Sequence, residues 1–383
     1  MIRGSMRPPV RAALVAALLT LSGGIAAGQG SPTPYRLLAT AESDDQVALI
    51  EFRPCPGEGC GARLVRTYAV GLWSAETEGP HGVIPDAEGR TFFVSLAHGR
   101  PNGFLQRVEL ESGRILGTVA LGMFPATVDR GAGDIIYSIN FNFEDPDMGV
   151  SSLSVVDGAS TQELARVPTC RMPHGSRLSP DGSRHYSGCM MDDLLVEIDT
   201  RTLEVSRLFG LKSGAEGPVA VAGRQEHAAM SHDMGPAPVS NSCSPTWAQP
   251  SADGKSVFVA CNRSAEIAEV DVASWTLTRR WSTPKAPYNL AVTPDGKLLV
   301  ATQKGPGTVS IWRIADATLL AEVKGTRGVA SGVVVSPDSR YAFATMEGVG
   351  GEPGTVDVID LSSLTRVGSV DMGKQAGGIA LLP

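Results

Sequence analysis

The chain has 383 residues, of which 33 are Lys or Arg and 40 are Asp or Glu, so its formal net charge is −7 at pH 7. An acidic chain without a run of basic residues lacks the positive surface that binding to DNA or RNA requires. Nucleic acid is therefore not an expected partner.

Residues 1–27 have the three-part layout of a secretory signal peptide. Three arginines precede an apolar run from Ala12 to Leu21, and small residues follow up to Ala27. The run is too short to cross a bilayer as a stable helix, and its flanks favour a cleaved signal over the alternative of a retained anchor. We expect a linker at 28–34 and a periplasmic or secreted mature protein without a membrane span.

An internal repeat begins near residue 35. Six segments share an apolar strand, a turn that usually contains Asp-Gly, an alternating strand, a polar loop and a strand ending in Asp. The aligned turn residues are Gly89, Gly133, Gly182, Gly254, Gly296 and Ser339. Spacings of about 40–50 residues between units of short strands are typical of β-propeller blades. One longer spacing indicates an insertion at 212–242, in the connection that leads into an inner strand.

The C-terminal segment completes the repeat. Residues 377–383 match the inner strand of a blade, whereas the strands expected at 35–40, 46–52 and 64–70 lack an inner one. Joining the two ends removes sheet edges that would otherwise be exposed. We therefore predict an all-β domain over 35–383: a seven-bladed β-propeller of four-stranded antiparallel blades, in which the C-terminal strand completes the first blade.

The repeat resembles the Tyr-Val-Thr-Asn family of β-propeller repeat proteins. Residues 258–262, Phe-Val-Ala-Cys-Asn, echo the family tetrapeptide, and Pro-Asp-Gly turns occur at 180–182 and 294–296. Cys261 departs from the pattern at the threonine-adjacent place. The chain is also similar, more loosely, to bacterial lactonase propellers. The resemblance implies the fold but no catalytic residue, because propellers host hydrolases, lyases, oxidoreductases and binding modules.

The six cysteines are expected to form three disulfides, because thiols of exported proteins oxidise. Two pairs flank turn glycines at matching places, eleven or twelve residues before and seven after, where the open end of a hairpin brings them together. A third pair closes a small ring. The alternative is a metal site formed by this third pair of cysteines and a second pair of residues that is distant in the sequence. The expected pairs are Cys55–Cys60, Cys170–Cys189 and Cys243–Cys261.

Counting back eight residues from each turn gives one structural position, at the start of the inner strand and near the mouth of the central channel. This position holds His81, Pro125, His174, Thr246, Tyr288 and Ser331. Both histidines lie in Pro-His-Gly, where proline fixes the chain and glycine allows close approach. Loops that follow the second strands emerge on the same face. They carry His98, Met190, Met191 and Asp192.

Five of the six histidines therefore map to one end of the propeller, and only His185 lies inside a strand. Imidazole and thioether groups suit copper, and imidazole with carboxylate suits zinc or iron. One hypothesis is a metal-dependent hydrolase or oxidoreductase. Its ion would be held by two mouth histidines, which are also the candidate catalytic residues, and by a third histidine. The two are His81 and His174, and the third is His98, His227 or His232.

The same residues have other interpretations. A mouth histidine without a metal could act as a general acid or base, with Glu144, Asp145 and Asp147 orienting it or binding calcium. The histidines could also simply cap the strands, and the acidic loop could be a solvated turn. We predict first a monomeric exported propeller that binds a small molecule, peptide or partner protein at the mouth. Its expected ligand contacts are Tyr288, Met190 and Asp192.

Overall fold

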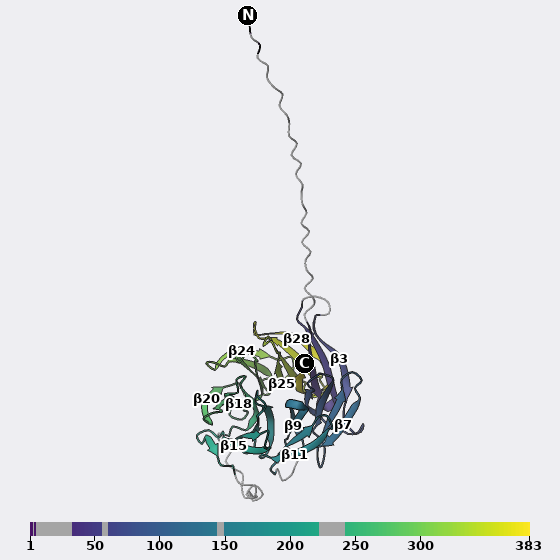
Figure 1. Cartoon of the computed structure of the whole chain (residues 1–383), viewed down its shortest axis with the longest axis vertical. Coiled ribbons are helices and arrows are strands. Elements are labelled where there is room, and N and C mark those ends of the chain that lie inside the picture. The colour runs from purple at the N-terminus through teal and green to yellow at the C-terminus, as the bar shows by residue number, and fades with distance from the viewer. Residues whose placement is uncertain (3, 5–32, 56–59, 144–148, 222–241) are drawn as a thin grey trace. The chain divides into compact units, whose positions relative to one another are not determined.

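Seven antiparallel sheets form a closed ring in the part of the chain from Thr33 to Pro383 (Figure 1). The computed structural model describes residues 1, 2, 4, 33–55, 60–143, 149–221 and 242–383. The expected signal peptide and most of the linker lie outside these ranges. Within them, no helix has the length and apolar character needed to cross a membrane.

The strands of each blade follow one another from the inner strand, next to the channel, to the outer strand. Blade 1 has β29 (Ala376–Leu381), β1 (Tyr35–Ala41), β2 (Gln46–Arg53) and β3 (Gly61–Ala69), and blade 2 has β4 (Pro80–Pro85), β5 (Thr91–Leu96), β6 (Phe104–Glu109) and β7 (Ile115–Ala120). Blade 3 has β8 (Pro125–Arg130), β9 (Ile135–Asn140), β10 (Ser152–Asp157) and β11 (Gln162–Pro168). Blade 4 has β12 (Pro173–Leu178), β13 (Arg184–Cys189), β14 (Leu194–Asp199), β15 (Glu204–Gly210) and β16 (Gly217–Val219).

The remaining three blades follow the same order. Blade 5 has β17 (Pro245–Pro250), β18 (Ser256–Cys261), β19 (Glu266–Asp271) and β20 (Thr276–Ser282). Blade 6 has β21 (Pro287–Val292), β22 (Leu298–Gln303), β23 (Thr308–Arg313) and β24 (Thr318–Lys324). Blade 7 has β25 (Val329–Val335), β26 (Tyr341–Glu347), β27 (Thr355–Asp360) and β28 (Thr365–Asp371).

The C-terminal strand closes the ring as predicted. Strand β29 pairs antiparallel with β1, so that Leu381 lies opposite Leu37 and Ile379 lies opposite Ala39. Each inner strand contacts the inner strand of the next blade around the whole ring, including β25 with β29 and β29 with β4. The two ends of the domain therefore share one blade.

Apolar clusters fill the spaces between neighbouring blades. Between blades 7 and 1, for example, Ile50 and Phe52 pack with Phe343 and Val358, all of them buried. Burying such side chains is worth about 1.5–3 kcal/mol each. Because each blade lies against two others, the stability of one blade depends on the presence of its neighbours.

The inner strands approach one another closely at the position after the mouth histidines. A Cβ atom on Gly378 would lie 2.2 Å from the carbonyl oxygen of His81, and one on Gly175 would lie 2.3 Å from that of Thr246. The same carbonyl of His81 accepts a hydrogen bond of 3.1 Å from the Thr40 hydroxyl of blade 1. The glycines thus allow the backbone contacts that hold adjacent blades together.

The structure differs from the sequence alignment in blade 3. Its first turn is closed by Gly131 N–H donating to the Ile135 carbonyl, four residues on, whereas in blade 4 Ser179 donates to Arg184, five residues on. The shorter turn shifts the frame by one residue. The expectation of Pro125 at the mouth was therefore wrong, and Ala126 occupies that place.

Blade 4 differs by one added strand. The insertion predicted at 212–242 begins with β16, which pairs antiparallel with the outer strand β15 and places Val219 opposite Leu208. Residues 222–241, which include His227 and His232, lie outside the described residues. The same is true of the acidic loop residues Glu144, Asp145 and Asp147.

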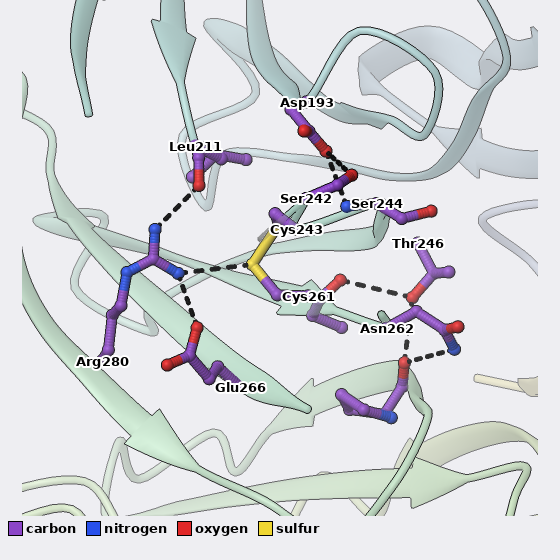
Figure 2. The surroundings of a disulfide bond; sticks show 12 residues. Asp193, Leu211, Ser242, Cys243, Ser244, Thr246, Cys261, Asn262, Glu266 and Arg280 are labelled. Carbon is purple, nitrogen blue, oxygen red and sulfur yellow. Dashed lines mark hydrogen bonds and ion pairs between the residues drawn. A yellow bond between two sulfur atoms is a disulfide. The ribbon is translucent and has the colours of Figure 1, made fainter. Parts of the chain in front are cut away.

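All three predicted disulfides are present. The Cα–Cα distances are 5.2 Å for Cys55–Cys60, 6.1 Å for Cys170–Cys189 and 4.4 Å for Cys243–Cys261. Figure 2 shows the last pair, where the Arg280 guanidinium contacts the Cys261 sulfur at 3.8 Å and donates to the Leu211 carbonyl. The bond joins the residues before β17 to the end of β18, at the open end of the hairpin.

Candidate functional site at the channel mouth

Seven side-chain positions surround the mouth of the central channel, one from each inner strand. They are His81, Ala126, His174, Thr246, Tyr288, Ser331 and Gly377. The cavity along the axis contains about 410 Å³ of empty space, including its open end, and is lined in part by His81, Tyr288 and Ser331. The structure therefore brings together His81, His174 and Tyr288 as predicted from the sequence.

His174 is a neutral, fully engaged side chain. Its Nδ1 lies 3.1 Å from the Thr246 carbonyl oxygen, which can only accept, so this nitrogen carries the hydrogen. Its Nε2 therefore accepts the hydrogen bond of 3.0 Å from the Tyr288 hydroxyl. Burial, reinforced by the nearby His81, lowers the pKa of His174 to about 3. Burial also raises the pKa of Tyr288, so this pair is uncharged at neutral pH.

Lys304 brings a positive charge to the same mouth. Its ammonium lies 4.1 Å from the centre of the Tyr288 ring and 3.0 Å from Glu347 Oε1. Burial opposes the charge on Lys304, but Tyr288, Glu347 and the more distant Glu42 outweigh it and raise the pKa of the ammonium. Lys304 and Glu347 thus form an ion pair next to the neutral histidine and tyrosine.

A buried carboxylate lies between two histidines on the other side of the mouth. Glu42, which follows β1, is 7% exposed. Its Oε1 lies 3.8 Å from His81 Nε2, and its Oε2 lies 3.7 Å from His98 Nε2. Gln375 donates a hydrogen bond of 3.0 Å to Oε2. In the described part of the chain, no Lys or Arg forms an ion pair with Glu42.

An aromatic wall supports the histidines. The Phe124 ring contacts the rings of His81 and His98 edge-on, at centroid distances of 5.6 and 5.2 Å. Phe141 contacts His174 in the same way at 4.9 Å. The His81 and His174 rings are 5.8 Å apart and nearly perpendicular. Packing between rings holds the imidazoles in place, and the small Ala126 between these two histidines adds no bulk to the mouth.

Two other residues predicted for the site, Asp192 and Met190, contact neighbouring side chains. Asp192 accepts two hydrogen bonds from Arg171, each 2.7 Å long, through its main-chain and side-chain nitrogens. Met190 packs against the cluster that contains Phe124 and Met172. Neither side chain joins the polar groups of the mouth that are described above.

Sequence reasoning missed Glu42, Lys304 and Glu347. Each lies at or just after the end of a second strand, as His98 and Met190 do. Applying that rule to every blade would have found the two residues of blades 6 and 7. Glu42 was harder to find, because the inner strand of its blade comes from the other end of the chain.

His81 and His98 each lie near one oxygen of the same carboxylate, that of Glu42. Within the described ranges, no three His, Cys, Asp or Glu side chains are already gathered as a metal site. The predicted pairing of His81 with His174 as metal ligands remains a prediction. Both ring nitrogens of His174 have hydrogen-bond partners, so this residue would have to release Tyr288 before it could bind an ion.

Comparison with known proteins supports the fold alone. No protein-family model matches the sequence, and no curated protein matches it. Hydrazine synthase from Kuenenia stuttgartiensis has a similar structure, with a TM-score of 0.57 and 20% identity over 76% of this chain and 81% of that one. A proposed 6-phosphogluconolactonase from Bacteroides fragilis has a TM-score of 0.66 and 14% identity over 92% and 99%. A proposed 6-phosphogluconolactonase from Bacteroides uniformis has a TM-score of 0.64 and 14% identity, over 91% of this chain and 99% of that one.

Proposed function

We propose that this chain is an exported β-propeller that binds a small ligand with a positively charged centre at the mouth of its channel. The observation that carries the proposal is the environment of Glu42. Its carboxylate is almost fully buried and, among the described residues, has no Lys or Arg as an ion-pair partner. Burying a carboxylate costs several kcal/mol unless a positive charge or several hydrogen bonds compensate.

The charges around the mouth favour a cation. The mouth holds two carboxylates, Glu42 and Glu347, and one ammonium, Lys304, which forms an ion pair with Glu347 and attracts Glu42 from farther away, so one negative charge is left to be balanced. The Phe124 ring lies against His81 and His98, and aromatic faces attract cations, as the Tyr288 ring does with Lys304. A ligand with an ammonium group or a metal ion would meet both requirements.

The proposed location agrees with the disulfides. Three disulfide bonds are typical of proteins in oxidising compartments, which supports the interpretation of residues 1–27 as an export signal. The resemblance to Tyr-Val-Thr-Asn repeat proteins is part of this proposal. An activity like that of the lactonase propellers is not proposed, because similarity at 14% identity supports only the fold.

A peptide or partner protein is the second candidate ligand. Four large apolar side chains are exposed on loops of the mouth face, and exposed apolar groups often mark a docking surface. They are Trp73 (64% exposed), Phe143 (56%), Met191 (46%) and Val349 (69%). These residues come from loops of different blades around the channel, so a partner that contacted them would cover the mouth.

Thermal unfolding in the presence of chosen cations tests the first proposal. The probes are choline, spermidine, lysine and the chlorides of zinc, copper and cobalt, each added to the protein after dialysis against a chelator. We expect at least one probe to raise the Tm of the wild type but not of Glu42→Gln. Glu88→Gln is the matched control, because Glu88 is exposed and lies in the turn between β4 and β5, at the opposite end of β4 from His81. If no probe raises the Tm, or if Glu42→Gln responds like the control, the proposal is wrong.

A further inference from the structure

We infer that Glu42, His81 and His98 hold a divalent transition-metal ion. This inference depends on the proposed cation site and names the cation. It also differs from the ligand set expected from the sequence, because a carboxylate takes the place of His174. Imidazole nitrogens with a carboxylate oxygen form a donor set that suits zinc and iron.

The orientation of His81 is the first argument. Its Nδ1 lies 2.7 Å from the Ala126 carbonyl oxygen, so Nδ1 carries the hydrogen in the neutral ring. Its Nε2 then presents a lone pair toward Glu42 Oε1. Two acceptors that face each other repel unless a positive centre lies between them. A proton on Nε2 or a metal ion supplies that centre without a change of tautomer, but the 3.8 Å between the two atoms is too long for the hydrogen bond that a proton would form.

The spacing of these atoms is the second argument. The distance of 3.8 Å between His81 Nε2 and Glu42 Oε1 is too long for a hydrogen bond. Zinc binds nitrogen and oxygen at about 2.0–2.2 Å, so two ligands at the tetrahedral angle lie about 3.3–3.6 Å apart. The observed gap exceeds this range by only a few tenths of an ångström. The 3.7 Å between His98 Nε2 and Glu42 Oε2 is similar.

The surroundings of these residues are those of metal ligands in proteins. A ligating histidine usually donates its other ring hydrogen to a carbonyl or carboxylate, as His81 does to Ala126. The Glu42 carboxylate is fixed by Gln375. The two residues are therefore oriented before any ion binds.

His98 must adjust its position to complete the site. It lies in the loop after β5, its side chain is 33% exposed, and its ring packs directly over Gly79. A Cβ atom at residue 79 would lie 1.8 Å from the His98 ring, so glycine makes room for it. Because the three side chains do not yet surround one point, we expect the ring of His98 to move toward His81 when the ion binds.

Metal titration of the full-length mature protein tests this inference. After dialysis against a chelator, the protein is titrated with zinc chloride by calorimetry, and with cobalt chloride while the visible spectrum is recorded. We expect one ion per chain and a cobalt spectrum of four- or five-coordinate geometry. Glu42→Gln and His81→Gln should each weaken zinc binding by at least about 100-fold, and His98→Gln by at least about tenfold.

Controls separate loss of the site from loss of the fold. His98 is partly exposed, so His98→Gln should keep the circular dichroism spectrum and Tm of the wild type. His185→Phe, in the interior of blade 4, should bind zinc like the wild type. Absence of zinc and cobalt binding, or unchanged affinity in His81→Gln and Glu42→Gln, overturns the metal site. If choline, spermidine or lysine still raises the Tm through Glu42, the cation-binding proposal survives without the metal. If those also fail, both are wrong.

Discussion

The buried histidine of blade 4 predicts a defined loss of stability in mild acid. His185 is fully buried, lies against the Tyr137 ring at 5.6 Å, and has no hydrogen-bond partner for either ring nitrogen in the described part of the chain. Burial, with a smaller effect of the positive Arg177, lowers the pKa of His185 from 6.5 to about 3. The folded protein therefore keeps this ring neutral well below the pH at which the unfolded chain protonates it.

The sign and size of the effect follow from that difference. Above pH 6.5 the ring is neutral in both states and contributes no pH dependence. Between pH 6.5 and 3 only the unfolded state binds the proton, so the free energy of unfolding falls as the pH falls. One pKa unit corresponds to about 1.4 kcal/mol, and pH 5 is about 1.5 units below the ordinary value of histidine. This one residue should therefore cost about 2 kcal/mol at pH 5.

Urea unfolding of wild type and His185→Phe at pH 7.5 and pH 5, followed by tryptophan fluorescence, measures this quantity. Phenylalanine keeps a ring of similar size against Tyr137, so we expect the two proteins to differ by no more than about 1 kcal/mol at pH 7.5. Between pH 7.5 and pH 5 the wild type should lose about 2 kcal/mol more than the variant. An equal loss in both proteins would show that His185 is not the buried base described here.

Three further predictions concern the ring itself. Gly378→Ala should lower the free energy of unfolding by more than about 2 kcal/mol in urea titrations, because its Cβ would clash with the His81 carbonyl. The control Gly351→Ala should change the free energy of unfolding by less than about 0.5 kcal/mol, because no atom lies within 4 Å of the added Cβ. Replacing both Cys243 and Cys261 by alanine should cost about 3 kcal/mol or more, since the bond closes a loop of this length; a loss below 1 kcal/mol would contradict this. Deleting residues 377–383 removes most of β29 and should lower the Tm sharply in calorimetry; an unchanged Tm would refute closure by this strand.

The fold was predictable because its signals are local and repeat. Each first turn needs a residue with positive φ at a fixed place, and the sequence supplies Gly182 (φ 70°) and Gly296 (φ 71°) there. Even the exception fits, because Ser339 adopts φ 61° in blade 7. The error in blade 3 had a local cause as well. Its turn is one residue shorter, so Gly133 was counted at a place that it does not occupy.

The positions of the site residues were predictable, but their partners were not. The repeat frame located His81, His174 and Tyr288 at the mouth. It could not show that Tyr288 lies within hydrogen-bond distance of His174, since this depends on the ring being closed to its actual diameter. It also could not show that both nitrogens of His174 are occupied. Side-chain orientation depends on contacts across blades, and the sequence period carries no information about them.

The closing strand connects the fold to the candidate site. Glu42 follows β1, the second strand of blade 1, so its position along the channel axis depends on β29, the inner strand that pairs with β1. Gln375, just before β29, donates to the Glu42 carboxylate. A Cβ atom on Gly377 would lie 2.6 Å from Glu42 Oε1, so a larger residue here would displace the carboxylate from its present position. The C-terminal segment that closes the ring therefore also shapes the pocket in which Glu42 faces His81.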